Sequence, residues 1–141
     1  MDHLSAEQRY RLWLQKTVEQ PSLHSELQQI GGNDEQIYER FYRDLTFGTA
    51  GLRGLIGAGT NRMNVYTVGV ATQGLADYLN AQGQGACVAI AYDSRIKSDV
   101  FARHAACVLA ANGIAVYLFD QLMPTYGSAW ISKAICTETL Q

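Results

Sequence analysis

Five glycines within twelve residues constrain this chain more than any other feature of its sequence. Gly48, Gly51, Gly54, Gly57 and Gly59 stand in one stretch of the 141-residue chain. Each glycine inside a helix costs about 1 kcal/mol relative to alanine, so no regular helix tolerates this density. The stretch is therefore predicted to be extended chain with turns, followed by a loop, between regular elements on either side.

The residues before the glycines carry helical patterns. Ser5 and Asn33 each precede a glutamine three residues later, which is the spacing of a helix N-cap. Pro21 is expected to end the first helix, because proline cannot continue the hydrogen-bonding pattern. Residues 1–44 are therefore predicted to form an N-terminal helical arm.

The residues after the glycines alternate between helix and strand patterns. Helical periodicity runs over 64–81, and two short apolar runs at 87–92 and 114–119 flank a helical segment at 98–111. A strand, a crossover helix and a second strand of these lengths form a βαβ unit, whose strands are parallel. The expected fold class is therefore α/β.

Composition and charge exclude several classes of function. The formal net charge is -2 and no basic run is present, which argues against nucleic-acid binding and against a membrane-surface role. The longest apolar stretch, 105–119, is shorter than the roughly 20 residues of a membrane span. Three cysteines without a C-x-x-C pair argue against a zinc ribbon. The N-terminus has no apolar signal region, so a cytoplasmic location is expected.

The segment F-G-T-A-G-L-R-G, residues 47–54, is a candidate phosphoryl-binding turn. Its glycines allow backbone N–H groups to approach an anion, Thr49 adds a hydroxyl donor, and Arg53 adds a guanidinium. The segment matches neither the P-loop nor the dinucleotide-binding pattern, so a glycine-rich bend with a solvated arginine is the alternative. Arg62 could serve the same anion as Arg53, or it could anchor the loop.

A second candidate, Y-D-S-R at residues 92–95, follows the first strand of the βαβ unit. Loops after parallel strands carry function in α/β folds, so Asp93 and Arg95 could orient each other or a ligand. The alternative is local structure, in which Asp93 holds a turn and Ser98 caps the next helix. This alternative is preferred for Asp93 and Ser98, while the role of Arg95 stays open.

Six segments together resemble the α-D-phosphohexomutase superfamily, and most of all its phosphoglucomutase and phosphomannomutase branch. They occur in the order and at the spacing of that family, between about Leu45 and Thr125. The segments are F-G-T-A-G-L-R-G, N-R-M-N at 61–64, Y-T-V-G-V-A-T-Q-G-L-A-D-Y-L at 66–79, A-Y-D-S-R at 91–95, A-A-N-G at 110–113 and L-M-P-T at 122–125.

The resemblance implies a fold and a chemistry. Family members have four domains, a phosphoserine that exchanges its phosphoryl group with hexose 1-phosphate and hexose 6-phosphate, and a magnesium ion held by a D-x-D-x-D-R loop. It implies that Arg53 reaches the phosphoserine region, that Thr49 shapes the turn, and that Asp93 and Arg95 support the neighbouring loop. Transfer of this kind depends on positioning and on cationic stabilisation of the moving group.

The sequence departs from the family after Thr125. It contains neither the T-A-S-H-N-P phosphoserine loop nor the magnesium loop, so no catalytic or metal-binding residue and no cofactor is assigned within it. Residues 45–125 are expected to form an incomplete α/β/α domain I with a mixed, partly parallel sheet, and 126–141 a divergent tail.

This chain is therefore expected to be an N-terminal piece of a phosphohexomutase and to be inactive when it is alone. Whether the chain is itself an enzyme stays open. The alternative is a small sugar-phosphate-binding or interaction module. Its apolar surface would favour self-association.

Overall fold

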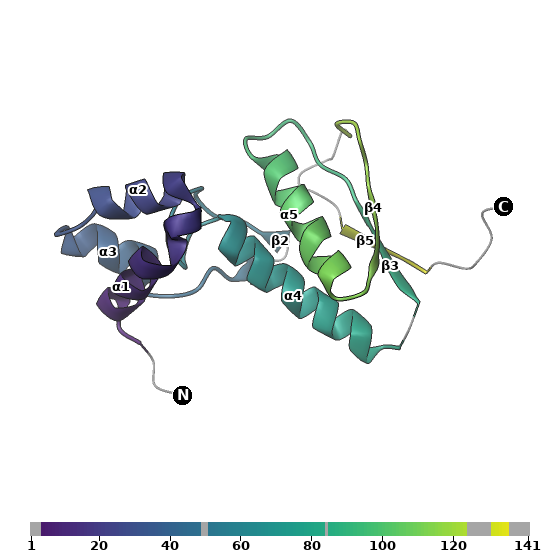
Figure 1. Ribbon diagram of the computed structural model, residues 1–141, viewed down its shortest axis with the longest axis horizontal. Coiled ribbons are helices and arrows are strands. Elements are labelled where there is room, and N and C mark those ends of the chain that lie inside the picture. The colour runs from purple at the N-terminus through teal and green to yellow at the C-terminus, as the bar shows by residue number, and fades with distance from the viewer. Residues whose placement is uncertain (1–3, 49–50, 84, 124–130, 136–141) are drawn as a thin grey trace. The chain divides into compact units, whose positions relative to one another are not determined.

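A computed structural model describes residues 4–48, 51–83 and 85–123, and the backbone of 131–135 (Figure 1). The chain divides into two compact units, Met1–Thr67 and Val68–Gln141, and each is described by itself. The first unit holds four short helical segments and a small hairpin: α1 (Ala6–Lys16), the 3-10 turn η1 (Thr17–Glu19), α2 (Pro21–Gln29), α3 (Asp34–Phe41), β1 (Phe47–Gly48) and β2 (Gly51–Leu52).

Short polar side chains start two of these helices, as the sequence predicts. The Ser5 hydroxyl accepts from the backbone N–H of Gln8, and Oε1 of Gln8 accepts in turn from the backbone N–H of Ser5. Asn33 caps α3 with a single bond, in which its side-chain oxygen accepts from the backbone N–H of Gln36. The prediction for Pro21 is wrong, because α1 has already ended at Lys16 and Pro21 begins α2, where its missing N–H costs nothing.

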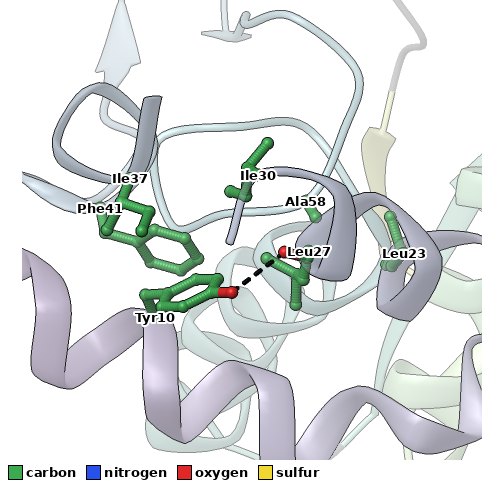
Figure 2. Packing of buried hydrophobic residues seen from close by; sticks show 7 residues of the cluster. All are labelled: Tyr10, Leu23, Leu27, Ile30, Ile37, Phe41 and Ala58. Carbon is green, nitrogen blue, oxygen red and sulfur yellow. Dashed lines mark hydrogen bonds between the residues drawn. The ribbon is translucent and has the colours of Figure 1, made fainter. Parts of the chain in front are cut away.

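The three α-helices of the first unit share one hydrophobic core (Figure 2). Phe41 is fully buried in this core, and the rings of Tyr10 and Trp13 lie edge-on to it at centroid distances of 6.0 and 5.7 Å. The Tyr10 hydroxyl donates to the carbonyl oxygen of Leu27 at 3.1 Å, so this buried polar group is satisfied. Ala58, from the glycine-rich region, is buried in the same cluster. The core therefore joins the helices to the segment that follows them.

The second unit contains most of α4 (Val65–Ala81), then β3 (Ala86–Ile90), α5 (Ser98–Ala111), β4 (Ala115–Leu118) and β5 (Ile131–Ile135). The sheet has the order β4-β3-β5. β3 pairs in parallel with β4, with Cys87 opposite Ala115, and antiparallel with β5. The crossover helix α5 packs on β4 (Figure 1). These pairings confirm the expected α/β class and the mixed, partly parallel sheet.

Within the second unit, side chains at two places connect α4 with α5 or with the residue that ends it. The side-chain amides of Gln73 and Asn112 exchange two hydrogen bonds, at 3.0 and 2.9 Å. A Cβ atom added to Gly69 would lie 2.9 Å from His104 Nε2, whereas a Cβ added to Gly74 would meet nothing within 4 Å. Gly69 therefore faces the ring of His104 on α5, whereas Gly74 faces open space.

This contrast predicts opposite results for two similar substitutions. Gly74→Ala is expected to raise the free energy of unfolding by about 0.5–1 kcal/mol, because alanine loses less backbone entropy than glycine in a helix. Gly69→Ala gains the same entropy but crowds His104, so it should be neutral or destabilising. Urea unfolding of both variants measures the difference, and an equal gain in both would mean that the His104 side chain turns away from the added methyl group without cost.

Among the described residues, no helix is both long and apolar enough to cross a membrane.

Candidate functional site

The glycine-rich stretch folds into a short hairpin in the first unit. β1 and β2 pair antiparallel, with Phe47 opposite Leu52 and Gly48 opposite Gly51. Gly51 has a φ of +92°, a backbone conformation that residues other than glycine rarely adopt. Thr49, one of the two predicted phosphate-binding residues, lies outside the described residues, so its role stays a prediction.

Arg53, the other predicted phosphate-binding residue, follows β2 directly and is exposed. Its guanidinium makes no hydrogen bond or ion pair with the described part of the chain. The remaining arginines of the first unit are all engaged: Arg9 with Asp44, Arg11 with Glu7, Arg40 with Glu26, Arg62 with Glu39, and Arg43 with Asn61. No described residue therefore occupies the donors of Arg53, which are the groups that an anion would bind.

Arg62 was open to two interpretations, and the structure favours the anchoring one. Its guanidinium makes a two-pronged contact with the Glu39 carboxylate of α3, including a bond from Nη1 to Oε1 at 2.9 Å. Only 12% of the Arg62 side chain is exposed. Because its charge is already matched by Glu39, Arg62 ties the loop to the helix rather than offering a second cation beside Arg53.

Asn64 closes the same loop and begins the next helix. Its buried side-chain amide donates to the carbonyl oxygens of Gly57 and Gly59, at 2.9 and 3.0 Å. Its side-chain oxygen accepts from the backbone N–H groups of Tyr66 and Thr67, both at 3.1 Å. One side chain thus fixes the loop from 57 to 64 and caps α4, a double role that its place in N-R-M-N does not reveal.

Asp93 and Arg95, the predicted loop-supporting residues, lie in the second unit, after β3. The Asp93 carboxylate accepts from the backbone N–H of Arg95 at 3.2 Å and from its Nε at 2.8 Å. The two residues therefore orient each other, which was one of the alternatives. The Arg95 side chain is 57% exposed, whereas that of Asp93 is 15% exposed.

Ser98 does not cap α5, so that expectation is wrong. Ser98 is the first helical residue, and the capping position is held by Lys97 in a left-handed conformation, with a φ of +62° and no side-chain cap bond. The Ser98 hydroxyl instead accepts from the backbone N–H of Asp93 at 3.3 Å. This bond joins the start of the loop that follows β3 to the first residue of α5.

Two carboxylates and one arginine that support the glycine-rich region were missed at the sequence level. Glu26, on α2, and Glu39 and Arg40, on α3, all bond to residues of the loop from 57 to 64. The two bonded residues are between 18 and 32 positions apart along the chain. No local spacing signals such contacts. In the described part of the chain, no three His, Cys, Asp or Glu side chains gather as a metal ion would require.

Comparisons with known proteins show which sequences this chain is similar to. A family model described as phosphoglucomutase/phosphomannomutase, alpha/beta/alpha domain I, matches residues 44–139. The match includes most of the segment after Thr125 that was expected to diverge. The phosphoglucomutases of Staphylococcus aureus strains USA300 and COL are each 41% identical to this chain over 114 residues. That alignment covers 81% of this chain and 20% of each relative, so the chain spans about one fifth of their length. No solved structure matches the chain significantly.

Proposed function

This chain belongs to the phosphoglucomutase/phosphomannomutase family through its domain I, and on that premise we propose that its glycine-rich hairpin binds the phosphoryl group of a hexose phosphate. The observation that carries the proposal is the guanidinium of Arg53, which makes no hydrogen bond or ion pair with any described residue. It stands next to β2 of the hairpin, it is exposed, and no described carboxylate neutralises it. A planar guanidinium offers paired donors that match phosphate oxygens.

The reaction proposed for the longer family proteins is the interconversion of hexose 1-phosphate and hexose 6-phosphate. A phosphoserine gives its phosphoryl group to the sugar monophosphate, and the resulting bisphosphate returns its other phosphoryl group to the serine. Arg53 takes part in neither bond. Its role is electrostatic, because it holds the negatively charged oxygens of the phosphoryl group in place.

This chain alone is expected to show no turnover. Its sequence contains no T-A-S-H-N-P segment, so it supplies no serine in the setting of the phosphoryl carrier, and Ser128 and Ser132 lack the histidine and asparagine neighbours of that serine. A coupled assay with glucose 1-phosphate, magnesium and the bisphosphate activator tests this expectation. Production of glucose 6-phosphate would contradict it.

Magnesium is implied for the family, but the described residues of this chain do not fit a magnesium site. The sequence has no D-x-D-x-D-R loop, and the described side chains include no group of three or more carboxylate, imidazole or thiolate ligands. Hard cations of this kind are held by carboxylates together with phosphate oxygens and water. No residue described here is therefore assigned to the ion.

Replacing Arg53 tests the proposed binding directly. Arg53→Ala is expected to weaken the binding of glucose 6-phosphate by about tenfold to a hundredfold, since a hydrogen bond to a charged group contributes about 1.5–3 kcal/mol. Arg53→Lys keeps the charge but loses the planar fork, so its affinity should fall between those of the wild type and the alanine variant. Isothermal titration at fixed ionic strength measures all three, because screening by salt changes such contacts.

Two controls make this result specific. Arg103→Ala removes another exposed arginine, on α5, and should leave the affinity unchanged. Titration with glucose, which carries no phosphate, should give no binding to any variant. If the wild type binds glucose as well as glucose 6-phosphate, or if both alanine variants behave alike, then Arg53 is not the phosphate-binding residue.

The alternative function, an interaction module without catalysis, is favoured by exposed apolar side chains on and after β4. Tyr117, Leu118 and Phe119 are each more than a third exposed. Exposed apolar surface of this kind favours association, so self-association stays a prediction, as does a cytoplasmic location.

A further inference from the structure

The hairpin that carries Arg53 has both of its arms fastened to one loop. On the incoming arm, the backbone N–H of Leu45 donates to the carbonyl oxygen of Thr60 at 2.8 Å. On the outgoing arm, the carbonyl oxygen of Leu55 accepts from the backbone N–H of Met63 at 2.8 Å. Arg53 lies between Leu45 and Leu55 in the sequence, so the loop from 57 to 63 anchors the segment that presents Arg53 at both of its ends.

That loop is in turn held by an ion pair between two helices. The Glu26 carboxylate, on α2, accepts from the backbone N–H of Ala58 at 2.9 Å and from Nη1 of Arg40, on α3. The same Nη1 atom donates to the carbonyl oxygen of Ala58 at 3.1 Å. The pair therefore satisfies both backbone groups of one buried loop residue. We name these three residues, Glu26, Arg40 and Ala58, the loop clamp.

The glycines on either side of Ala58 make room for the loop clamp. A Cβ atom on Gly57 would lie 2.7 Å from Glu26 Oε1, and one on Gly59 would lie 2.8 Å from the backbone oxygen of Arg40. Both distances are too short for a side chain, so the helices and the loop approach as closely as glycine permits. The ion pair is partly shielded from water, because only 14% of the Arg40 side chain is exposed.

We propose that Glu26 and Arg40 are positioning residues for phosphate binding, which hold the supporting loop so that Arg53 is presented to its ligand in one place. The inference rests on the proposed function of Arg53. Neither residue is assigned a contact with the phosphate. The charge of Arg40 is matched by Glu26, so its contribution acts through the backbone of the loop and not through the ligand. Positioning of this kind raises affinity because fewer conformations are lost when the ligand binds.

Glu26→Gln separates this role from direct binding. The Glu26 carboxylate uses one oxygen to accept from Arg40 and the other to accept from Ala58. A glutamine amide is neutral and has only one accepting oxygen, so the loop clamp loses its ion pair and one of these two acceptors. Affinity for glucose 6-phosphate is expected to fall about threefold to tenfold, within the range over which residues of one hydrogen-bond network couple. Arg40→Lys should act in the same direction. Glu7→Gln, which breaks the exposed pair with Arg11 on α1, is the matched control and should leave the affinity unchanged.

Two further readouts distinguish positioning from a general loss of stability. Amide hydrogen exchange should accelerate at Leu45 and Met63 in Glu26→Gln, while the amides of α5 keep their protection. In an Arg53→Lys background, Glu26→Gln should weaken binding less than it does in the wild type, because its effect passes through Arg53.

The outcomes separate this inference from the function on which it rests. Absence of glucose 6-phosphate binding by the wild type would overturn the proposed function, and the inference with it. Normal affinity in Glu26→Gln, or unchanged exchange at Leu45 and Met63, would overturn the positioning role alone. Equal weakening in the wild-type and Arg53→Lys backgrounds would do the same.

Discussion

Phe41→Ala is expected to lower the free energy of unfolding by about 3–5 kcal/mol, the usual cost of emptying a large aromatic site in a core. Phe41 is fully buried and takes edge-on contacts from Tyr10 and Trp13. Its removal leaves a cavity that the short helices around it cannot close without losing their own contacts. Urea unfolding, followed by circular dichroism and by tryptophan fluorescence, measures the loss.

Phe47→Ala is the matched control for this result. Phe47 has the same side chain but lies on β1 with 67% of its surface exposed. Its replacement should change the free energy of unfolding by no more than about 0.5 kcal/mol, as is usual for surface positions. Phe41→Leu removes less volume than alanine does and should fall between the two. A similar small loss in Phe41→Ala and Phe47→Ala would mean that the three α-helices share no packed core.

Gly59→Ala is expected to cost about 2–4 kcal/mol, from backbone strain and overpacking together. Gly59 has a φ of +132°, and its Cβ would lie 2.8 Å from the Arg40 carbonyl oxygen and 2.9 Å from Arg40 Cβ. Neither neighbour is the mobile end of a side chain, so the helix or the loop must shift. The same unfolding measurement applies, and the phosphate affinity should fall with it because the loop supports the hairpin.

Gly32→Ala isolates the backbone part of this effect. Gly32 also has a positive φ, of +82°, but a Cβ there would meet nothing within 4 Å. Only the left-handed conformation is penalised, at about 1–2 kcal/mol. If Gly32→Ala costs as much as Gly59→Ala, the close approach between the loop and α3 contributes nothing.

The regular elements were predictable because their signals are local. The βαβ unit was recognised from two apolar runs and the periodic segment between them, and the structure places that helix at Ser98–Ala111. The caps at Ser5 and Asn33 were predictable for the same reason, since each involves residues three positions apart. The predictions for Pro21 and Ser98 were wrong, because a proline or a serine near a helix end suits several positions. Pro21 begins a helix and does not end one, and Ser98 is the first residue of α5 and not its cap.

The support of the candidate site could not be predicted in this way. Arg53 was selected from its setting among glycines, but the sequence does not say which arginines find a carboxylate. The loop clamp joins α2, α3 and the loop, with partners 14, 18 and 32 positions apart. Such contacts exist only once the helices have packed around Phe41. The difference between a free arginine and an engaged one is therefore a property of the tertiary structure.

The order of the three-stranded sheet has a consequence for how the second unit folds. β3 is the central strand, and each of its pairings with β4 closes a shorter loop of chain than any of its pairings with β5. The entropic cost of loop closure rises with loop length, and contacts between distant residues form slowly. We therefore expect β3, α5 and β4 to assemble first during folding, and β5 to join last. Until it does, one edge of β3 offers open backbone groups to any neighbouring strand, which makes this step the one most exposed to mispairing.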